Sequence, residues 1–409
     1  MEKVVPPKYV RQILVTLRAR GHLAYLVGGC VRDMLLGVRP QDWDICTSAL
    51  PEQVLDIFPG ARPTGLKHGT VTVRINSRSA EVTTFRTESG YADHRHPDTV
   101  RFVGDLRSDL SRRDFTINAM ALSPEGVLMD PFGGAADLEK RLIRCVGSPE
   151  LRFEEDALRM FRALRFAAKL GFQLEEETLR AIGKKAPLAA DLAAERVRDE
   201  VEKILLSPAP DTVQLLMAQG LMDAYARPPL AGAESFAPLS RLPRKALDRW
   251  AGLSFILLRQ GCISSAEDFL SRLRLDSRTI RCCTAAEALL ARPMPASPVE
   301  WKRLLSRWGV DAVNCASTCA DAVFGVRSRP ALKAVLKSGD CFSLKHLAIG
   351  GDELLALGLS GRALGGTLNA LLDYVIEHPE ANRPEPLLAL AEEWIRNGEI
   401  HGHLGKAEN

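Results

Sequence analysis

Residues 26–47 read LVGGCVRDMLLGVRPQDWDICT, and this stretch holds a pair of glycines and a closely spaced pair of aspartates. Asp42 and Asp44 flank Trp43 in a segment that we expect to be a β-strand, where side chains two residues apart project from the same face. Two carboxylates side by side repel each other, and aspartate is depleted in strands, so a cation should lie between them. Ligands that offer only oxygen favour Mg²⁺, which is often shared with substrate phosphates. The sequence therefore predicts Asp42 and Asp44 as metal ligands.

A glycine turn just upstream predicts a place for those phosphates. Residues 24–27 are typical of a strand, Gly28 and Gly29 of a turn, and residues 31–36 of a short helix. Glycines let backbone N–H groups approach an anion closely, and the beginning of a helix favours negative charge. Arg32 would lie in the first turn of that helix, where a cation needs an anionic partner. The combination predicts a site for a metal-bound phosphate group.

The composition is that of an ordinary globular protein. The 409 residues are too many for one hydrophobic core and predict several domains. Hydrophobic residues make up 46% and charged residues 26%. There is no apolar run long enough to span a membrane and no signal peptide, so we expect a cytoplasmic protein without a membrane partner. The nine cysteines lack paired CxxC spacing, which argues against a disulfide framework or a zinc site.

Two patterns of hydrophobicity divide the chain. Over the first third, short strand patterns alternate with helical ones, and beyond it only helical periodicity continues. Residues 71–75 and 80–85 are typical of two strands around a turn, and residues 119–122 and 127–130 of a second hairpin. We therefore expect an α/β head followed by an all-helical remainder.

A third carboxylate is expected near the aspartate pair. Glu81 opens the strand pattern EVTTFR at residues 81–86. If that strand lies beside the aspartates, Glu81 could complete the metal site and accept a proton from an attacking hydroxyl group. A glutamate that faces solvent at the end of a strand explains the same residue equally well.

Residues 111–122, SRRDFTINAMAL, place two arginines directly before an apolar segment. A guanidinium group binds phosphate oxygens in a bidentate manner, so we interpret Arg112 and Arg113 as a phosphate clamp, with a solvated charged face as the alternative. Asp114 is expected to be an N-cap. Asn118 could bond a sugar hydroxyl group or hold the hairpin.

Residues 153–172, FEEDALRMFRALRFAAKLGF, predict one long helix that ends at Gly171. Apolar residues nearly surround this helix, so most of it should be buried. It nevertheless carries a charged residue at every third position, namely Asp156, Arg159, Arg162 and Arg165. A salt bridge between Asp156 and Arg159 would be one structural explanation, but the surplus of buried arginine needs another anion or a polar ligand.

The pair of Asp156 and Arg159 suits the recognition of a nucleic-acid base. A carboxylate only accepts hydrogen bonds, and a guanidinium group only donates them. Cytosine and adenine present an amino donor beside a ring-nitrogen acceptor, whereas uracil and guanine present a carbonyl group beside an N–H. The pair would therefore accept C and A and leave buried polar groups unpaired against U and G. This pattern predicts selection of CTP and ATP by the protein itself.

With these motifs together, the chain resembles the class II tRNA nucleotidyltransferases, the CCA-adding enzymes of the polymerase β superfamily. The resemblance covers residues 22–172 in family order, through LVGGCVRDMLLG with DWD, HGTVTV, EVTTFRTESGYADHRHP, SRRDFTINAMAL, DPFGGAADLEKRLIRCVG and EEDALRMFRALRFAAKLGF. It implies template-independent addition of C, C and A to the 3′ end of tRNA by two-metal-ion catalysis, with release of pyrophosphate. It implies Asp42 and Asp44 as Mg²⁺ ligands, and nucleotide contacts from Gly29, Arg32, Arg113, Asp156, Arg159, Arg162 and Arg165.

The resemblance also implies a division into four domains. These are a catalytic nucleotidyltransferase head with a polymerase β-like mixed sheet at 1–147, a helical base-selecting neck at 148–215, a helical body at 216–340 and a helical tRNA-binding tail at 341–409. Residues 352–375, DELLALGLSGRALGGTLNALLDYV, resemble the family's tail. The chain could be a monomer or a homodimer.

The expected macromolecular partner is tRNA, held at its acceptor stem and 3′ end through shape and phosphates rather than sequence. Residues 241–281 hold nine basic and four acidic residues. We expect this region to form part of the RNA-binding surface, with an ordinary solvated helix face as the alternative.

Close relatives with other products are the alternatives. A poly(A) polymerase of the same class would lengthen A tails, and other relatives add only A or only CC. The uninterrupted EVTTFRTESGYADHRHP pattern favours CCA addition over poly(A) synthesis, and the intact residues 86–101, with Asp93 and Arg95, argue against a CC-only enzyme. An A-only enzyme stays open. A head that binds RNA without chemistry, or a nucleotide sensor, would be a different class, but both metal aspartates are present.

Overall fold

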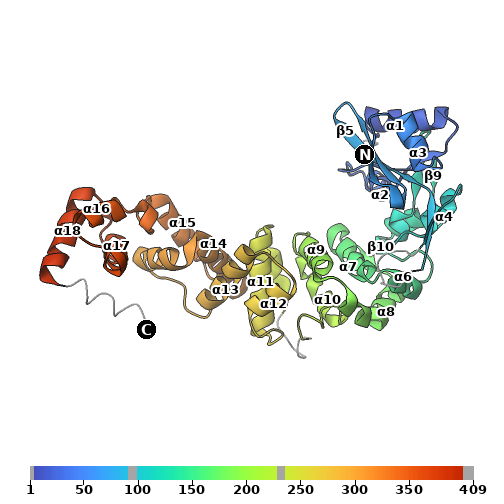
Figure 1. The fold of residues 1–409 in the computed structure, drawn as a ribbon. Coiled ribbons are helices and arrows are strands. Elements are labelled where there is room, and N and C mark those ends of the chain that lie inside the picture. Colours follow the sequence, from blue (N-terminus) through green and yellow to red (C-terminus); the bar gives the residue numbers. More distant parts are fainter. Residues whose placement is uncertain (1–3, 91–98, 228–234, 399–409) are drawn as a thin grey trace. The chain divides into compact units, whose positions relative to one another are not determined.

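The computed structural model describes residues 4–90, 99–227 and 235–398, and Figure 1 shows its helices and strands. The chain forms two compact units, Met1–Ala233 and Glu234–Asn409. All strands of the described residues lie in the first unit, and residues 235–398 contain helices but no strand. The expected order, an α/β head followed by a mostly helical remainder, is confirmed.

A mixed seven-stranded sheet forms the centre of the head. Its strands follow the order β3-β4-β5-β2-β1-β8-β9. Strands β2 and β5 are parallel, and the other neighbouring pairs are antiparallel. The bounds are β1 Ala24–Val27, β2 Asp44–Thr47, β3 Arg62–Gly65, β4 Thr70–Ile75, β5 Arg78–Thr84, β8 Ala121–Leu122 and β9 Leu128–Met129. Strands β6 Arg86–Ser89 and β7 Thr99–Phe102 form a separate antiparallel pair.

The hairpin between β4 and β5 places Glu81 in the middle of its strand. Asn76 and Ser77 both have positive φ angles, 48° and 65°, as in the two-residue turns that suit the twist of paired strands. Strand β5 therefore begins at Arg78, and the expectation that Glu81 opens the strand is wrong. In the sheet Glu81 lies directly beside Asp44 of β2.

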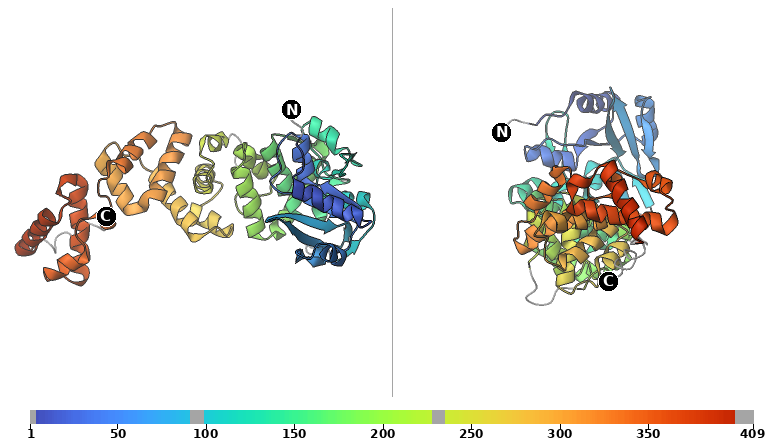
Figure 2. Two further views of the ribbon diagram at one scale, coloured as in Figure 1. Left: turned by 90° about the horizontal axis from the view of Figure 1, so that it is seen from above. Right: turned by 90° about the vertical axis from the view of Figure 1, so that its left-hand side faces the viewer.

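The two faces of the sheet are covered by different elements. On one face Ile45 joins a core with the helices α1 Lys8–Ala19, α2 Gly29–Leu35 and α3 Pro51–Ile57, and Figure 2 shows α1 beside the strands. On the opposite face Cys46 packs with Leu110 of α4 Leu106–Ser111. Because side chains alternate along a strand, Asp44 and its neighbour Glu81 point to this second face.

The long helix predicted over residues 153–172 is two helices. Helix α6 Pro149–Glu155 ends where Asp156 adopts an extended backbone conformation, with φ −144° and ψ 103°, and α7 Leu158–Leu170 follows. The second helix ends at Gly171 in a left-handed conformation, as expected. The short strands β10 Leu142–Ile143 and β11 Gln173–Leu174 pair in parallel, so the predicted neck is not purely helical.

The other elements of the first unit are helical. They are η1 Leu66–His68, η2 Thr116–Asn118, α5 Gly134–Glu139, α8 Glu176–Lys185, η3 Ala186–Asp191, α9 Ala194–Leu205, η4 Pro210–Thr212 and α10 Val213–Ala218.

The second unit is a succession of helices. They are η5 Ala237–Arg241, α11 Ala246–Arg259, α12 Ala266–Arg272, α13 Ser277–Leu290, α14 Pro298–Phe324, α15 Arg329–Ser338, η6 Leu344–His346, α16 Gly351–Ala356, α17 Gly361–Glu377, η7 Pro379–Ala381 and α18 Pro384–Asn397. Helix α14 is kinked at Gly309, where φ is 77°. Among the described residues, every helix is too short or too polar to cross a membrane.

Candidate active site in the head and neck

Three carboxylates line one pocket on the second face of the sheet. Asp42, Asp44 and Glu81 surround a cavity of about 470 Å³, together with Trp43 and Thr72. Asp44 begins strand β2, so Asp42 precedes the strand and its position does not follow from strand alternation as we expected. The predicted proximity of the two aspartates is nevertheless present, because both line this pocket.

The electrostatics of the pocket favour a cation. Burial, together with the negative charges of Glu81 and Asp42, raises the pKa of Asp44 against the opposing effect of Arg113. Within the residues that the structure describes, none of the three carboxylates forms an ion pair or a side-chain hydrogen bond. In the same ranges no three His, Cys, Asp or Glu side chains are gathered closely enough to hold a metal ion alone. Two carboxylates completed by water and phosphate oxygens are a usual Mg²⁺ environment, so the residues fit that ion.

The glycine turn lies close to this pocket, because Sγ of Cys30, directly after the turn, lies 3.7 Å from the backbone oxygen of Asp44. Gly28 has a φ angle of 77°, and a Cβ atom there would lie 3.0 Å from Nη1 of Arg113. Gly28 precedes α2, which begins at Gly29, two residues earlier than the sequence pattern predicted. The backbone of this turn can therefore approach Arg113 and a bound anion together.

Arg32 is buried and already has polar partners. It donates to Asp33 Oδ1 from Nε at 2.8 Å and from Nη2 at 2.7 Å, and from Nη1 to Asn118 Oδ1 at 2.7 Å. Asp33, the next residue in the chain, is thus one anionic partner of Arg32. The side chain of Asn118 bonds Arg32 and Asp114 rather than the hairpin, and its contact with a sugar hydroxyl group stays a prediction.

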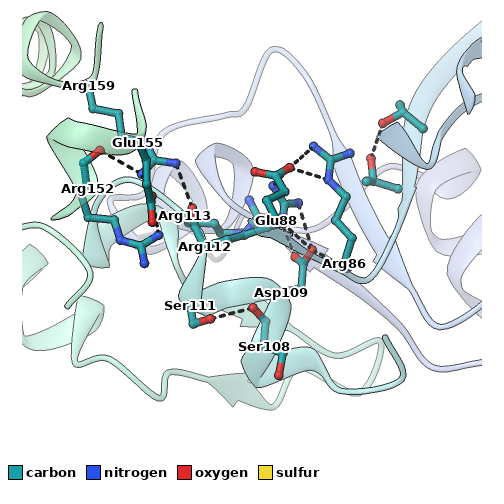
Figure 3. Close-up of polar contacts among 12 residues, drawn as sticks. Arg86, Glu88, Ser108, Asp109, Ser111, Arg112, Arg113, Arg152, Glu155 and Arg159 are labelled. Atoms are coloured by element: carbon teal, nitrogen blue, oxygen red, sulfur yellow. Dashed lines mark hydrogen bonds and ion pairs between the residues drawn. The ribbon is translucent and has the colours of Figure 1, made fainter. Parts of the chain in front are cut away.

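A buried carboxylate that sequence reasoning missed orients the two adjacent arginines (Figure 3). Asp109 is fully buried; its Oδ1 accepts from Arg112 Nε at 3.1 Å, and its Oδ2 accepts from Arg113 Nη2 at 3.1 Å. Asp109 precedes these arginines by three and four residues, which is the spacing of neighbours on a helix and could have marked it. The buried Nε of Arg113 has no hydrogen-bond partner among the described residues, so Arg113 keeps a donor for a ligand.

Asp114 is not the N-cap that we expected. Its Oδ1 accepts from the backbone N–H of Phe115 at 2.8 Å, and its Oδ2 accepts from Nε and Nη2 of Arg162 at 3.0 and 2.6 Å. Burial raises the pKa of Asp114, but the Arg162 guanidinium and the hydrogen bonds outweigh burial and lower the pKa to about 2. Asp114 therefore joins the head to helix α7.

We expect Asp114→Asn to destabilise the protein by about 2 kcal/mol at pH 7, because the folded-state pKa lies below the usual carboxyl value. A carboxyl group whose pKa is lower in the folded state stabilises the protein at pH values above its unfolded-state pKa. This stabilisation is lost as the pH falls through the folded-state pKa. The difference from the wild type should therefore shrink between about pH 4 and pH 2. Urea unfolding at several pH values measures it, with the exposed Asp56→Asn as the control; equal stabilities at pH 7 would contradict the role of this pair.

Asp156 and Arg159 lie at the junction of α6 and α7 but are not paired with each other. Asp156 Oδ1 accepts from the backbone N–H of Leu158 at 3.1 Å, and the Asp156 carboxylate forms an ion pair with Arg196 at 3.2 Å. Arg159 forms an ion pair with Glu155 at 2.5 Å. The structural alternative of a salt bridge between Asp156 and Arg159 is thus wrong. The carboxylate of Asp156 and the guanidinium group of Arg159 are thus held by different partners, Arg196 and Glu155.

The surplus arginines of α7 also have carboxylate partners within the protein. Arg162 is held by Asp114, and Arg165 lies 2.7 Å from Glu200 of α9. Both guanidinium groups lie over the ring of Phe166, at 5.6 and 4.4 Å from its centroid, and Arg32 approaches the same ring at 5.2 Å. The other anions that these arginines were expected to need are thus carboxylates of the protein itself, and they hold the arginines beside the predicted site.

The basic residues between 241 and 281 do not form one exposed face. Arg249 is buried and donates to the carbonyl oxygens of Leu242 and Pro243 at 2.8 and 2.9 Å, and Arg278 forms an ion pair with Asp311. A role of the remaining residues in RNA binding stays a prediction. Asp93 and Arg95, which argued against a CC-only enzyme, lie outside the described residues.

Comparison with known proteins finds relatives along nearly the whole chain. Residues 24–144 match the family described as Poly A polymerase head domain, and residues 171–229 match the probable RNA and SrmB-binding site of polymerase A. A CCA-adding enzyme of Geobacillus sp. (strain WCH70) is 39% identical over 407 residues, which are 97% of each chain. The crystal structure of the Bacillus stearothermophilus CCA-adding enzyme in complex with CTP is similar with a TM-score of 0.83 at 35% identity, over 97% of this chain and 100% of that chain.

Proposed function

The chain belongs to the family of CCA-adding enzymes, and from this premise we propose that it adds C, C and A to the 3′ end of tRNA. The reaction uses CTP and ATP without a nucleic-acid template and releases pyrophosphate. The observation that carries the proposal is the pocket of Asp42, Asp44 and Glu81, which lies beside the Gly28 turn and within electrostatic reach of Arg113.

Asp42 and Asp44 are the residues that would hold magnesium. Bound there, two Mg²⁺ ions would supply Lewis-acid chemistry by activating the RNA 3′-hydroxyl group and neutralising the triphosphate. The Gly28–Gly29 turn and Arg113 bind and orient the triphosphate through backbone N–H and guanidinium donors. Glu81 lies beside Asp44 in the sheet, where its carboxylate can accept the proton of the 3′-hydroxyl group.

Asp156 and Arg159 select the base. The carboxylate accepts from the amino group of cytosine or adenine, and the guanidinium group donates to the ring nitrogen beside it. At the junction of α6 and α7, Arg196 holds the carboxylate of Asp156 and Glu155 holds the guanidinium group of Arg159, and both contacts support this role. Arg32, Arg162 and Arg165, gathered around Phe166, contribute the remaining nucleotide contacts.

The rest of the chain serves the RNA. In the proposed division, the head at 1–147 and the neck at 148–215 carry the chemistry, and the body at 216–340 and the tail at 341–409 bind tRNA beyond its acceptor stem. The protein acts in the cytoplasm.

A single assay tests the proposed function. The purified protein is incubated with Mg²⁺ and a tRNA that lacks its last three nucleotides, with CTP, with ATP or with both, and the products are separated on a sequencing gel. We expect CC from CTP alone and CCA from the mixture. Long A tails would indicate a poly(A) polymerase, addition of A only to a tRNA that already ends in CC would indicate a partial enzyme, and no product would contradict the proposal.

A further inference from the structure

Asp109 lies at the centre of a chain of contacts that links Arg113 with Arg159 (Figure 3). Its carboxylate is fully buried on helix α4. It accepts hydrogen bonds from the side chains of Arg112 and Arg113 and from the backbone N–H of Arg86, at 3.3 Å. A group with this many charged and backbone partners fixes several segments of the head at once.

Through Arg113 the first branch of the chain reaches the glycine turn, near the pocket of Asp42, Asp44 and Glu81. One end of the Arg113 guanidinium group is bonded to Asp109 at 3.1 Å, and Nη1 faces Gly28. The turn leads into helix α2, whose Cys30 thiol donates to the backbone carbonyl of Asp44 at 3.7 Å. Asp109 therefore determines how the guanidinium lies against the glycine turn.

The second branch reaches Arg159 through Arg112. The side chain of Arg112 is bonded to Asp109 at 2.9 Å and to Glu88 of β6 at 3.1 Å. The backbone carbonyl of Arg112 accepts from Nη2 of Arg159 at 3.3 Å. Anchoring the side chain of Arg112 thus anchors the carbonyl oxygen against which Arg159 lies.

We propose that Asp109 is a positioning residue that holds Arg113 for the triphosphate and, through Arg112, holds Arg159 for base selection. The inference rests on the proposed function, and it links the residue that binds the triphosphate to the residue that selects the base. The negative charge of Asp109 also balances the arginines around it: burial and the charge of Arg112 lower the pKa of the half-buried Arg86, whereas Glu88 and Asp109 raise it. Without that charge the guanidinium groups would repel one another and leave these positions.

Asp109→Asn tests the proposal because it keeps the shape of the side chain and removes its charge. We expect kcat for CTP to fall about 10- to 100-fold, as for other residues that orient catalytic groups, and selection of CTP over UTP to fall about tenfold. The matched control is Asp105→Ala on the same helix, which removes the N-cap bonds to Arg107 and Ser108 but touches neither arginine pair. This control should keep both kcat and selection.

Arg112→Met separates the two branches, because it leaves Asp109 and Arg113 in place. We expect it to reduce selection against UTP about tenfold, with a smaller loss of kcat for CTP than Asp109→Asn causes. Circular dichroism confirms folding, and if Asp109→Asn does not fold, Arg112→Met decides the branch to Arg159 by itself. The inference would be overturned if Asp109→Asn kept the wild-type kcat and selection, or if Asp105→Ala lost as much of both as Asp109→Asn. Unchanged selection in Arg112→Met would also overturn it. A wild-type protein that adds no CCA would instead overturn the proposed function.

Discussion

Replacing Asp44 with asparagine is expected to lower the rate of nucleotide addition about a thousandfold or more, because metal-ion catalysis supplies several kcal/mol of transition-state stabilisation. Asparagine keeps the size of the side chain but removes the charge that would hold the cation. The rate is measured as single-turnover addition of CMP to a tRNA that lacks its terminal nucleotides. Asp56→Asn, an exposed change on helix α3, serves as the control and should retain the wild-type rate.

The same substitution should not weaken the fold of the metal-free protein. Burial and the neighbouring carboxylates raise the pKa of Asp44 above its usual value, so its ionised form costs folding free energy at neutral pH. That cost disappears as the pH falls through the raised pKa, and it disappears at every pH when asparagine replaces Asp44. The variant should therefore unfold at the same temperature as the wild type or higher. A rate within tenfold of the wild type, or loss of folding, would contradict the role assigned to Asp44.

Replacing Asp156 with asparagine is expected to reduce the discrimination between CTP and UTP about 10- to 100-fold, the range expected for one hydrogen bond to a charged group. The asparagine oxygen can still accept from the backbone N–H of Leu158, so helix α7 keeps its beginning. Its amide nitrogen, however, adds a donor that can meet a carbonyl oxygen of uracil. The ratio of kcat/KM for CTP to that for UTP measures the effect.

Arg196→Met is the matched control for this prediction. It removes the ion-pair partner of Asp156 but leaves the carboxylate that would contact the base. We expect this variant to retain most of the discrimination. Unchanged discrimination in Asp156→Asn, or a larger loss in Arg196→Met than in Asp156→Asn, would contradict base recognition by Asp156.

Local patterns were sufficient to predict the centre of the head. The strand β1, the glycine turn and the helix α2 follow from residues that are adjacent in sequence, and so does the closeness of Asp42 and Asp44. Strand limits were less accurate, because β2 begins at Asp44 and β5 at Arg78. Turn geometry at Asn76 and Ser77, rather than side-chain type, determines where β5 begins.

The partners of the arginines could not be predicted in the same way. Arg162 and Asp114 are separated by 48 residues, so their contact depends on the packing of α7 against the head. The break at Asp156 was also missed, because the apolar pattern continues across it without a proline or glycine. Asp109 was within reach of sequence reasoning, since its spacing from Arg112 and Arg113 is that of helix neighbours.

The pairing of each arginine with a carboxylate has a consequence for the site. Arg113, Arg159, Arg162 and Arg165 are held by Asp109, Glu155, Asp114 and Glu200. Guanidinium groups fixed before the nucleotide arrives lose less conformational entropy when they bind it. The carboxylates of Asp42, Asp44 and Glu81 have no such partner among the described residues, and this contrast supports the proposal that they bind a cation.

The most direct test is a crystal structure with CTP and Mn²⁺ as a replacement for Mg²⁺, because Mn²⁺ is located by its anomalous scattering. The account predicts anomalous density between the carboxylates of Asp42 and Asp44, with the triphosphate lying along the turn at Gly28 and Gly29. Anomalous density elsewhere, with the two carboxylates pointing apart, would contradict it.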